Sequence, residues 1–318
     1  MTLSKTKTII TTEKLTKVYS KGKKALDALD LAVEQGEIFG YLGPNGAGKT
    51  TTIRLLLDFI RPTSGHAQLF GLDTTRDSQA IRARLGYLPA ELNLWNNLTA
   101  RHVVDYMAAL RGMTDKRYIA ELGERLEFNF SLRIKSFSTG NKRKLGLILA
   151  LMHKPDLLIL DEPSSGLDPL MQQTFNQLML EAKANGQTVF LSSHVLGEVQ
   201  AICDRVAILR GGQLQEVDRV DKLTHADFAY IALRFRETVP ASVFAGLQGA
   251  SNVNVDGRNA RLQWKGDFDP LLRALVPYYV EDLSVQEPSL EEVFLTFYGE
   301  EPAVNGKSKP HATKEKSK

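Results

Sequence analysis

A short glycine-rich segment combines backbone freedom with an ammonium and a hydroxyl group, in the order G-x-x-x-x-G-K-[ST]. Its residues are Gly43, Pro44, Asn45, Gly46, Ala47, Gly48, Lys49 and Thr50, followed by Thr51. Glycines allow backbone N–H groups to point inward around phosphates, and a helix that begins near Lys49 directs its positive end to the same place. We therefore predict an ATP-binding loop in which Lys49 reaches the β- and γ-phosphates and Thr50 ligates Mg²⁺. The alternative is a plain glycine turn, which the apolar strand expected before it and the helix expected after it disfavour.

Two acidic residues follow a second apolar run, Leu157–Leu160, which has the pattern of a buried parallel strand. Asp161 is predicted to hold Mg²⁺ through water, because this ion keeps several of its waters in proteins. Glu162 lies next to it and is predicted to polarise the attacking water as a general base. An acidic pair after a strand is common, so this prediction depends on the glycine-rich loop being present in the same chain.

Over about residues 8–220 the chain resembles the ATP-binding subunits of ABC transporters. Between the two nucleotide motifs, Phe137-Ser138-Thr139-Gly140-Asn141 is similar to the signature sequence of that family, usually Leu-Ser-Gly-Gly-Gln, with Ser138 and Gly140 kept. The resemblance implies that this segment meets ATP bound to the opposite subunit, so that two such domains act face to face. Taken alone, Ser138 would be an ordinary helix N-cap.

Three further positions match the same family. Ser165-Gly166-Leu167-Asp168 is similar to the loop that crosses the interface between the two subunits, and His194 to the histidine that contacts the γ-phosphate. Tyr19 resembles the aromatic residue that stacks on adenine, with an ordinary packed or exposed tyrosine as the alternative. The resemblance thus implies Lys49, Glu162 and His194 as the catalytic residues.

One position departs from the family pattern. A glutamine that reaches Mg²⁺ usually follows the run matching Gly86-Tyr87-Leu88-Pro89, and this chain has Ala90 there. Glu91 is next and could ligate the metal in its place, or could be a solvated loop acid; both readings stay open. We expect the loop still to couple to a membrane partner, with weakened or rerouted contact to Mg²⁺.

Other sequence segments make the resemblance more specific, because they are similar to the ATPase subunits of ABC-2-type exporters. They are Arg61-Pro62-Thr63-Ser64-Gly65, the run at 86–89, and Pro288-Ser289-Leu290-Glu291-Glu292-Val293-Phe294. In that group the ATPase and the membrane permease are separate chains, which implies a cytoplasmic subunit held at the inner face of the cell membrane. It also implies a homodimer or a pair of ATPase subunits, with ATP and Mg²⁺ as cofactors. An ABC ATPase of translation or repair, or a non-catalytic nucleotide sensor, is the alternative.

The alternation of strands and helices predicts an α/β fold with a parallel sheet. The resemblance implies the P-loop NTPase fold of the ABC ATPase type, with a parallel sheet core, an antiparallel β subdomain and a helical subdomain. Strands, helices and turns alternate over 8–222, with helices expected at 50–59, 142–153 and 169–184, and we take this range as the ATP-binding domain. Residues 226–299 follow the order β-α-β-β-α-β, which predicts a small α+β ferredoxin-like domain. It includes helices at Pro240–Leu247 and Phe268–Val276, with a last amphipathic helix at Ser289–Tyr298.

The composition also argues against several kinds of partner and segment. The net charge of +3 depends on residues 302–318, predicted to be a disordered tail, whose last twelve positions contain five lysines and one glutamate. The rest is close to neutral, which argues against a nucleic acid partner. No run approaches the roughly 18 apolar residues of a membrane span, and no signal peptide is expected. The one cysteine, Cys203, cannot form an internal disulfide, and we expect it to be a buried apolar residue.

Overall fold

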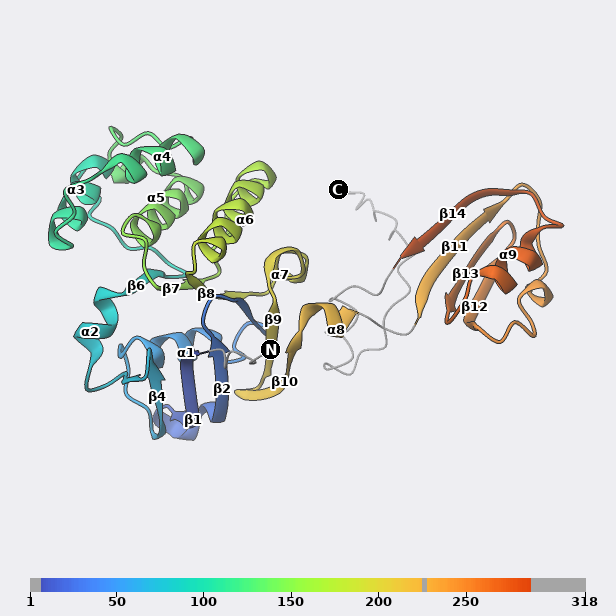
Figure 1. Cartoon of the computed structure of the whole chain (residues 1–318), viewed down its shortest axis with the longest axis horizontal. Helices are drawn as coiled ribbons and strands as arrows, with labels where there is room; N and C mark the ends of the chain where they lie inside the picture. The colour runs from blue at the N-terminus through green and yellow to red at the C-terminus, as the bar shows by residue number, and fades with distance from the viewer. Residues whose placement is uncertain (1–6, 225–227, 287–318) are drawn as a thin grey trace, which may run out of the picture. The chain divides into compact units, whose positions relative to one another are not determined.

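In the computed structural model, which describes residues 7–224 and 228–286, the chain divides into one unit of Met1–Ala226 and a second unit of Asp227–Lys318 (Figure 1). Each unit is described separately. The predicted tail at 302–318, the predicted helix at Ser289–Tyr298 and the exporter-like phrase at 288–294 lie outside the described residues.

A six-stranded sheet in the order β10-β9-β3-β8-β7-β6 forms the centre of the first unit. Its strands are β3 (Ile38–Leu42), β6 (Leu85–Leu88), β7 (Leu157–Asp161), β8 (Thr188–Ser193), β9 (Arg205–Arg210) and β10 (Gln213–Arg219). All neighbouring pairs are parallel except β9 with β10. Every residue of β3, β7 and β8 is buried, as expected for strands covered on both faces. The predicted parallel core is therefore confirmed.

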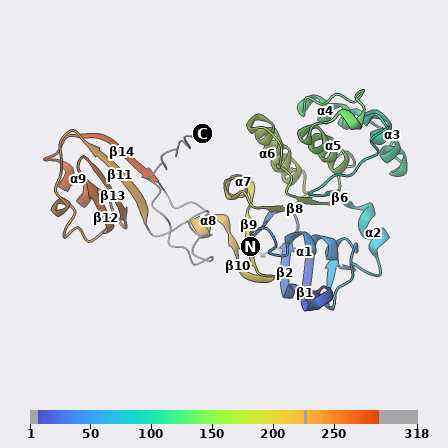
Figure 2. The same cartoon turned by 180° about the vertical axis from the view of Figure 1, so that it is seen from behind.

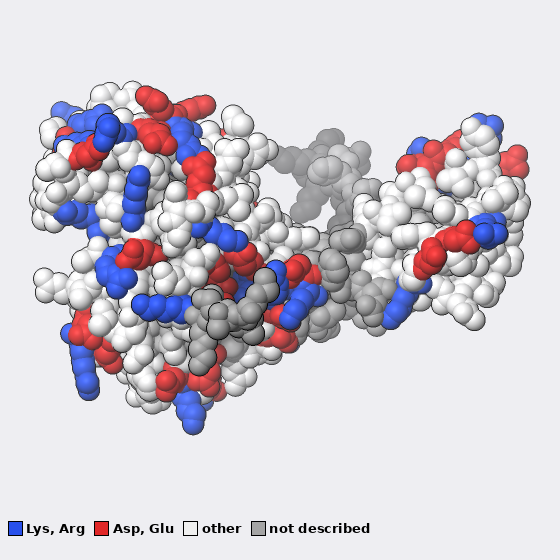
Figure 3. Space-filling model, viewed as in Figure 1, with Lys and Arg blue, Asp and Glu red and all other residues white. Residues whose placement is uncertain are grey.

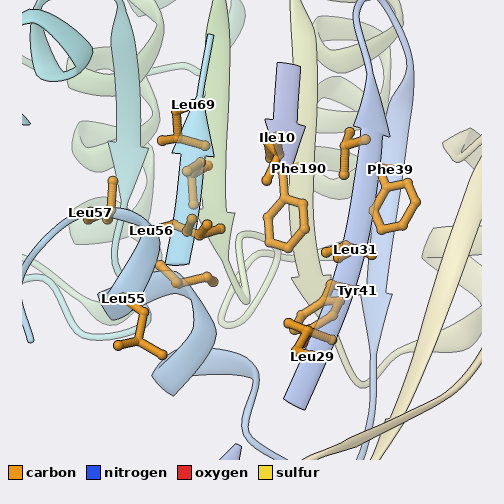
Figure 4. Close-up of a cluster of buried hydrophobic side chains, with 14 of the residues drawn as sticks. Ile10, Leu29, Leu31, Phe39, Tyr41, Leu55, Leu56, Leu57, Leu69 and Phe190 are labelled. Carbon is orange, nitrogen blue, oxygen red and sulfur yellow. The ribbon is translucent and has the colours of Figure 1, made fainter. Parts of the chain in front are cut away.

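An antiparallel sheet in the order β2-β1-β4-β5 packs beside this core. Its strands are β1 (Thr8–Val18), β2 (Lys24–Glu34), β4 (Ser64–Leu69) and β5 (Leu72–Asp73). Figure 4 shows side chains of both sheets meeting: Ile10, Leu29 and Leu31 from the antiparallel sheet lie close to Phe39, Tyr41 and Phe190 from the parallel one. This shared core also includes Leu55 and Leu56 of helix α1, so it fixes the helix that follows the glycine-rich loop.

The helices of the first unit are α1 (Lys49–Leu56), α2 (Ser78–Ala83), α3 (Ala100–Leu110), α4 (Arg117–Arg125), α5 (Thr139–Leu151), α6 (Pro169–Ala184), α7 (Leu196–Ile202) and α8 (Val220–Thr224). The unit also has two 3₁₀ turns: η1 (Ser20–Gly22) lies between β1 and β2, and η2 (Ile134–Ser136) precedes α5. Helices α3, α4 and α5 form a group on one side of the parallel sheet, and the antiparallel sheet lies on the other (Figures 1 and 2). The predicted helical subdomain corresponds to this group.

The helix predicted at 50–59 ends earlier than expected. Helix α1 stops at Leu56, and Asp58 has φ 57°, a left-handed conformation that ends a helix. The helix predicted at 142–153 begins earlier, at Thr139, because the Ser138 side chain accepts a hydrogen bond from the Asn141 N–H and caps it.

The second unit contains a four-stranded antiparallel sheet in the order β12-β13-β11-β14. Its elements are β11 (Ala229–Phe235), the 3₁₀ turn η3 (Ala241–Val243), β12 (Ala250–Asp256), β13 (Asn259–Trp264), helix α9 (Asp269–Leu275) and β14 (Val280–Gln286). This strand order is that of a ferredoxin-like fold. Its own core includes Phe235, Leu262 and Trp264 of the sheet and Leu271 of the helix.

The helix predicted at Pro240–Leu247 is wrong. Only the single turn η3 forms, and the residues after it continue in three-residue hydrogen-bonded steps, such as Ala245 N–H to the Ser242 carbonyl. Gly246 then adopts φ +91°, a conformation that no right-handed helix contains. The apolar residues of this segment, whose spacing suggested a helix, therefore lie on a compact loop.

Among the described residues, no helix has the length and apolar content needed to cross a membrane. On the face drawn in Figure 3, acidic and basic side chains are interspersed over the first unit. This mixture agrees with the near-neutral balance that the sequence predicts outside the lysine-rich tail.

Candidate functional site

Three functional segments follow the ends of neighbouring parallel strands. The glycine-rich loop follows β3, Glu162 follows β7 and His194 follows β8, and β8 pairs with both other strands. In register, Leu42 lies beside Ser193, and Asp161 beside Ser192. Because the carboxyl ends of parallel strands share one edge of the sheet, the fold brings these segments together at the place where ligands bind in open α/β sheets.

The glycines of the loop have conformations and surroundings that other residues would not tolerate. Gly48 is the N-cap of α1 with φ 114°, and Gly46 has φ +83°. A Cβ atom on Gly43 would lie 2.6 Å from the Leu209 carbonyl oxygen and 2.9 Å from the Ala47 Cβ. The loop therefore keeps a narrow backbone path that ends at a helix N-terminus, as phosphate binding requires.

Lys49 is buried and directs its ammonium into the loop, where Nζ donates to the Gly43 carbonyl at 2.6 Å. The next residue, Thr50, donates from Oγ1 to Asp161 Oδ2 at 2.9 Å. A hydroxyl and a carboxylate oxygen thus meet, and both are the hard oxygen ligands that Mg²⁺ prefers. No group of three or more His, Cys, Asp or Glu residues suited to a metal occurs in the part of the chain that is described. A magnesium ion here would therefore depend on Thr50, Asp161, waters and the nucleotide's own phosphates.

Glu162 occupies a strained backbone position between an ammonium group and an imidazole ring. Its φ is 51°, which is unusual for a residue with a Cβ atom, and its N–H donates to the Ser192 carbonyl at 3.1 Å. Its carboxylate lies 3.3 Å from Lys49 Nζ and 2.6 Å from His194 Nδ1. The structure therefore brings Lys49, Glu162 and His194 into one cluster, and strain of this kind is typical of functional sites.

Two contacts of this cluster have no signal in the sequence. Ser192 donates from Oγ to Asp161 Oδ1 at 2.5 Å and orients the carboxylate. Ser164 donates to Glu198 on α7 at 2.5 Å, which ties the loop after Glu162 to the helix after His194. Burial raises the pKa of Glu198, the Ser164 hydrogen bond opposes this, and the charge of Glu162 adds to the rise. These partners are 31 and 34 residues apart, so only the fold reveals them.

The signature-like segment lies at the exposed start of α5. Ser138 is exposed and acts as the N-cap of that helix, with 3.2 Å between its Oγ and the Asn141 N. Gly140 packs against the loop that contains Gly166: a Cβ on Gly140 would be 3.0 Å from the Gly166 carbonyl oxygen. Within one chain, no hydrogen bond of the described residues joins Ser138 to residues 43–50. Its exposure leaves it available to a second subunit.

Two further predicted residues also lie outside the cluster. Tyr19 is 37% exposed, with the Lys17 ammonium 5.5 Å from its ring centroid, and forms no described hydrogen bond with the glycine-rich loop. Glu91 is exposed and makes no hydrogen bond or ion pair within the described residues. At the preceding position, the Ala90 carbonyl accepts a hydrogen bond from Arg143 at 2.8 Å.

The fold and the site define the class of this protein, a P-loop ATPase. Comparisons with known proteins narrow it, since residues 26–165 match the family described as ABC transporter. The bacitracin transport ATP-binding protein BcrA of Bacillus licheniformis is 36% identical over 300 residues, 92% of this chain and 98% of that one. The uncharacterized ABC transporter ATP-binding protein YcbN of Bacillus subtilis (strain 168) is 36% identical over 228 residues, 71% of this chain and 74% of that one.

A solved structure agrees with these relatives. The structure described as the ATP binding subunit of an ABC transporter has a TM-score of 0.63 and 28% sequence identity, and the match covers 68% of this chain and 91% of that one. The chain belongs to the family of ABC transporter ATP-binding proteins, which are the ATP-hydrolysing subunits of these transporters. The resemblance inferred from the sequence motifs is confirmed.

Proposed function

We propose that this chain powers a separate ABC-2-type membrane permease by exporter-type ATP hydrolysis at the cytoplasmic face of the membrane. The observation that carries this proposal is the convergence of Lys49, Thr50, Asp161, Glu162 and His194 at one sheet edge. The 98% coverage of a bacitracin transport protein supports the exporter reading, because that relative is matched over nearly its whole length.

We assign the site residues as follows. The backbone of residues 43–48, with Lys49 and Thr51, holds the phosphates, and Tyr19 stacks on the base. Thr50 and Asp161 hold Mg²⁺, which neutralises charge on the phosphates when bound. The carboxylate of Glu162 takes the proton of the attacking water, and His194, 2.6 Å away, keeps that carboxylate oriented and reaches the γ-phosphate. Glu91 is exposed, which supports its interpretation as a solvated loop acid rather than as a metal ligand.

The second half of the site comes from another ATPase subunit in this proposal. Ser138 and Gly140 lie at the exposed N-terminus of α5, whose free N–H groups suit an anion. Among the described residues, no hydrogen bond joins either of them to Lys49, Glu162 or His194 of the same chain. We propose a homodimer, with residues 8–222 as the ATP-binding domain and 226–299 as an accessory domain.

The test compares the full-length protein with Glu162→Gln. The wild-type protein should release phosphate from ATP only with Mg²⁺, whereas the variant should bind ATP with similar affinity and lose at least a hundredfold in rate. Light scattering should show that the variant accumulates as a dimer with ATP. Near-normal turnover in Glu162→Gln would contradict the base assignment.

The transport part of the proposal needs its own test. A tagged protein purified from native membranes should bring a polytopic permease with it, and Lys49→Ala should lose ATP affinity without losing this partner. Recovery of ribosomes or DNA in place of a membrane protein would contradict the transporter function.

A further inference from the structure

Arg143, in the second turn of α5, is buried and binds two loops at once. Its Nη1 and Nη2 donate to the Pro89 and Ala90 carbonyls at 2.8 Å each, and its Nε donates to the Ser165 carbonyl at 3.3 Å. Only 6% of the residue is exposed. Within the described residues no carboxylate lies within ion-pair distance of it, so all three acceptors are backbone carbonyls.

A buried cation without a contacting carboxylate is costly, which argues for a specific role. Burial lowers the pKa of Arg143, and the charges of Asp161 and Glu162 act in the opposite direction. The positive charge is therefore supported from a distance by the carboxylates of the ATP site. Arginine suits this position, because its planar fork presents several donors in fixed directions, whereas a lysine offers one compact ammonium.

The loops that Arg143 binds are both next to proposed functional residues. Pro89 and Ala90 follow β6 at the position where a glutamine is usual, and Ser165 lies three residues after Glu162. The Ser165 loop also packs on the start of α5, since a Cβ on Gly166 would be 3.0 Å from Thr139 Cγ2. One guanidinium thus joins the Ala90 loop, the loop after the proposed base and the helix that presents Ser138.

We propose that Arg143 is a positioning residue for ATP turnover: it fixes the Pro89–Ala90 loop and the Ser165 loop to helix α5. Because the methyl group of Ala90 is too short to reach the site, the hydrogen bonds from Arg143 to the backbone of this loop replace a side-chain contact at this position. A movement of any one segment is then passed to the other two. This inference rests on the proposed function and names a residue that the motif analysis did not assign.

Amide hydrogen exchange on the full-length protein tests the tie without requiring turnover. Both Arg143→Met and Arg143→Lys should speed exchange at least tenfold in peptides covering 88–92 and 163–168. The control is Arg111→Met, because Arg111 also donates to backbone carbonyls, those of Ala83 and Leu85, away from the ATP site. Unchanged exchange in both loops would overturn the proposal. If Arg143→Met does not fold, Arg143→Lys, which keeps the charge, decides the matter.

Kinetics separates positioning from a general loss of structure. Measured at saturating subunit concentration, both Arg143 variants should lower kcat at least tenfold while the dissociation constant of ATP changes less than threefold. Equal losses in ATP affinity and kcat, together with a lower Tm, would show a merely structural role and overturn the inference. An inactive wild-type protein would contradict the proposed function instead, and the exchange measurement would still decide the role of Arg143.

Discussion

Glu162 combines an unfavourable backbone conformation with a side chain that makes two close contacts in the site. The residue has φ 51°, where a Cβ atom clashes with the backbone, yet its carboxylate bridges Lys49 and His194. The hydrogen bond from the Glu162 N–H to the Ser192 carbonyl on β8 holds this conformation. The strain therefore gives the carboxylate a direction that an extended continuation of β7 would not give.

The strain at this position predicts a difference between two inactive variants. Glu162→Gly and Glu162→Ala both remove the carboxylate, but only alanine keeps a Cβ in the left-handed conformation. The glycine variant should be more stable by about 0.5–1 kcal/mol, since the relief of strain exceeds the backbone entropy that glycine loses on folding. Urea unfolding of the first unit measures the difference. An alanine variant at least as stable as the glycine variant would show that Glu162 is not strained.

Glu198 makes the stability of the site depend on pH. Its pKa in the native protein is raised above the ordinary value of 4.5, mainly by burial, with Ser164, Glu162 and His194 as its charged and polar neighbours. A raised carboxyl pKa means that the native state binds the proton more tightly than the unfolded state. Its stabilising contribution is present below about pH 4.5 and is lost as the pH rises through the native pKa.

The Tm of the wild type minus the Tm of Glu198→Gln should therefore decrease as the pH rises from 4 to 7. Glu181 provides a control of opposite sign, because the hydrogen bonds from Arg125 lower its pKa. For Glu181→Gln the advantage of the wild type should be present above pH 4.5 and shrink as the pH falls. Calorimetry over this range measures both, and parallel pH profiles for the two variants would contradict the assignment.

At the scale of elements, the sequence predicted those segments whose local pattern matches their tertiary role. The buried strands and the helix Pro169–Ala184, which begins with a proline and an Asp168 cap, follow from apolar runs and capping residues. The glycine-rich loop and the acidic pair were found from their own motifs next to apolar runs, and His194 was found from the resemblance to the family. Arg143 and Glu198 were not, because their partners lie on loops distant in sequence, and only the packed sheet brings them together.

The joint between β6 and α5 gives a prediction at this scale. Gly86 lies where the strand meets the helix, and a Cβ there would be 2.2 Å from the Ala150 carbonyl oxygen and 2.8 Å from Leu158 Cδ2. Gly86→Ala should lower the free energy of unfolding by about 1–3 kcal/mol, because a backbone oxygen cannot move aside as a side chain can. Gly197→Ala on α7 is the control, since a Cβ there meets nothing within 4 Å. Equal stability of the two variants in urea unfolding would contradict this packing.

At the scale of the whole molecule, each unit has a hydrophobic core among the described residues, and these two cores share no residue. The core of the first unit includes Phe39 and Phe190, and that of the second includes Phe235 and Trp264. All the residues proposed to bind or hydrolyse ATP belong to the first unit. A unit with its own core can fold alone, so the nucleotide chemistry should not require the second.

Truncation tests this independence. A chain that ends at Thr224 should give a single cooperative unfolding transition and bind a fluorescent ATP analogue with a dissociation constant within about twofold of the full-length value, because its core and its ATP cluster are complete. Lys49→Ala in the same truncated chain controls for non-specific binding and should abolish the signal. Aggregation of the truncated chain, or a much weaker affinity for nucleotide, would show that the second unit supports the ATP site. Normal affinity with altered turnover would instead place the influence of the second unit on the hydrolytic cycle, because every group proposed to bind the nucleotide would still be present in the truncated chain.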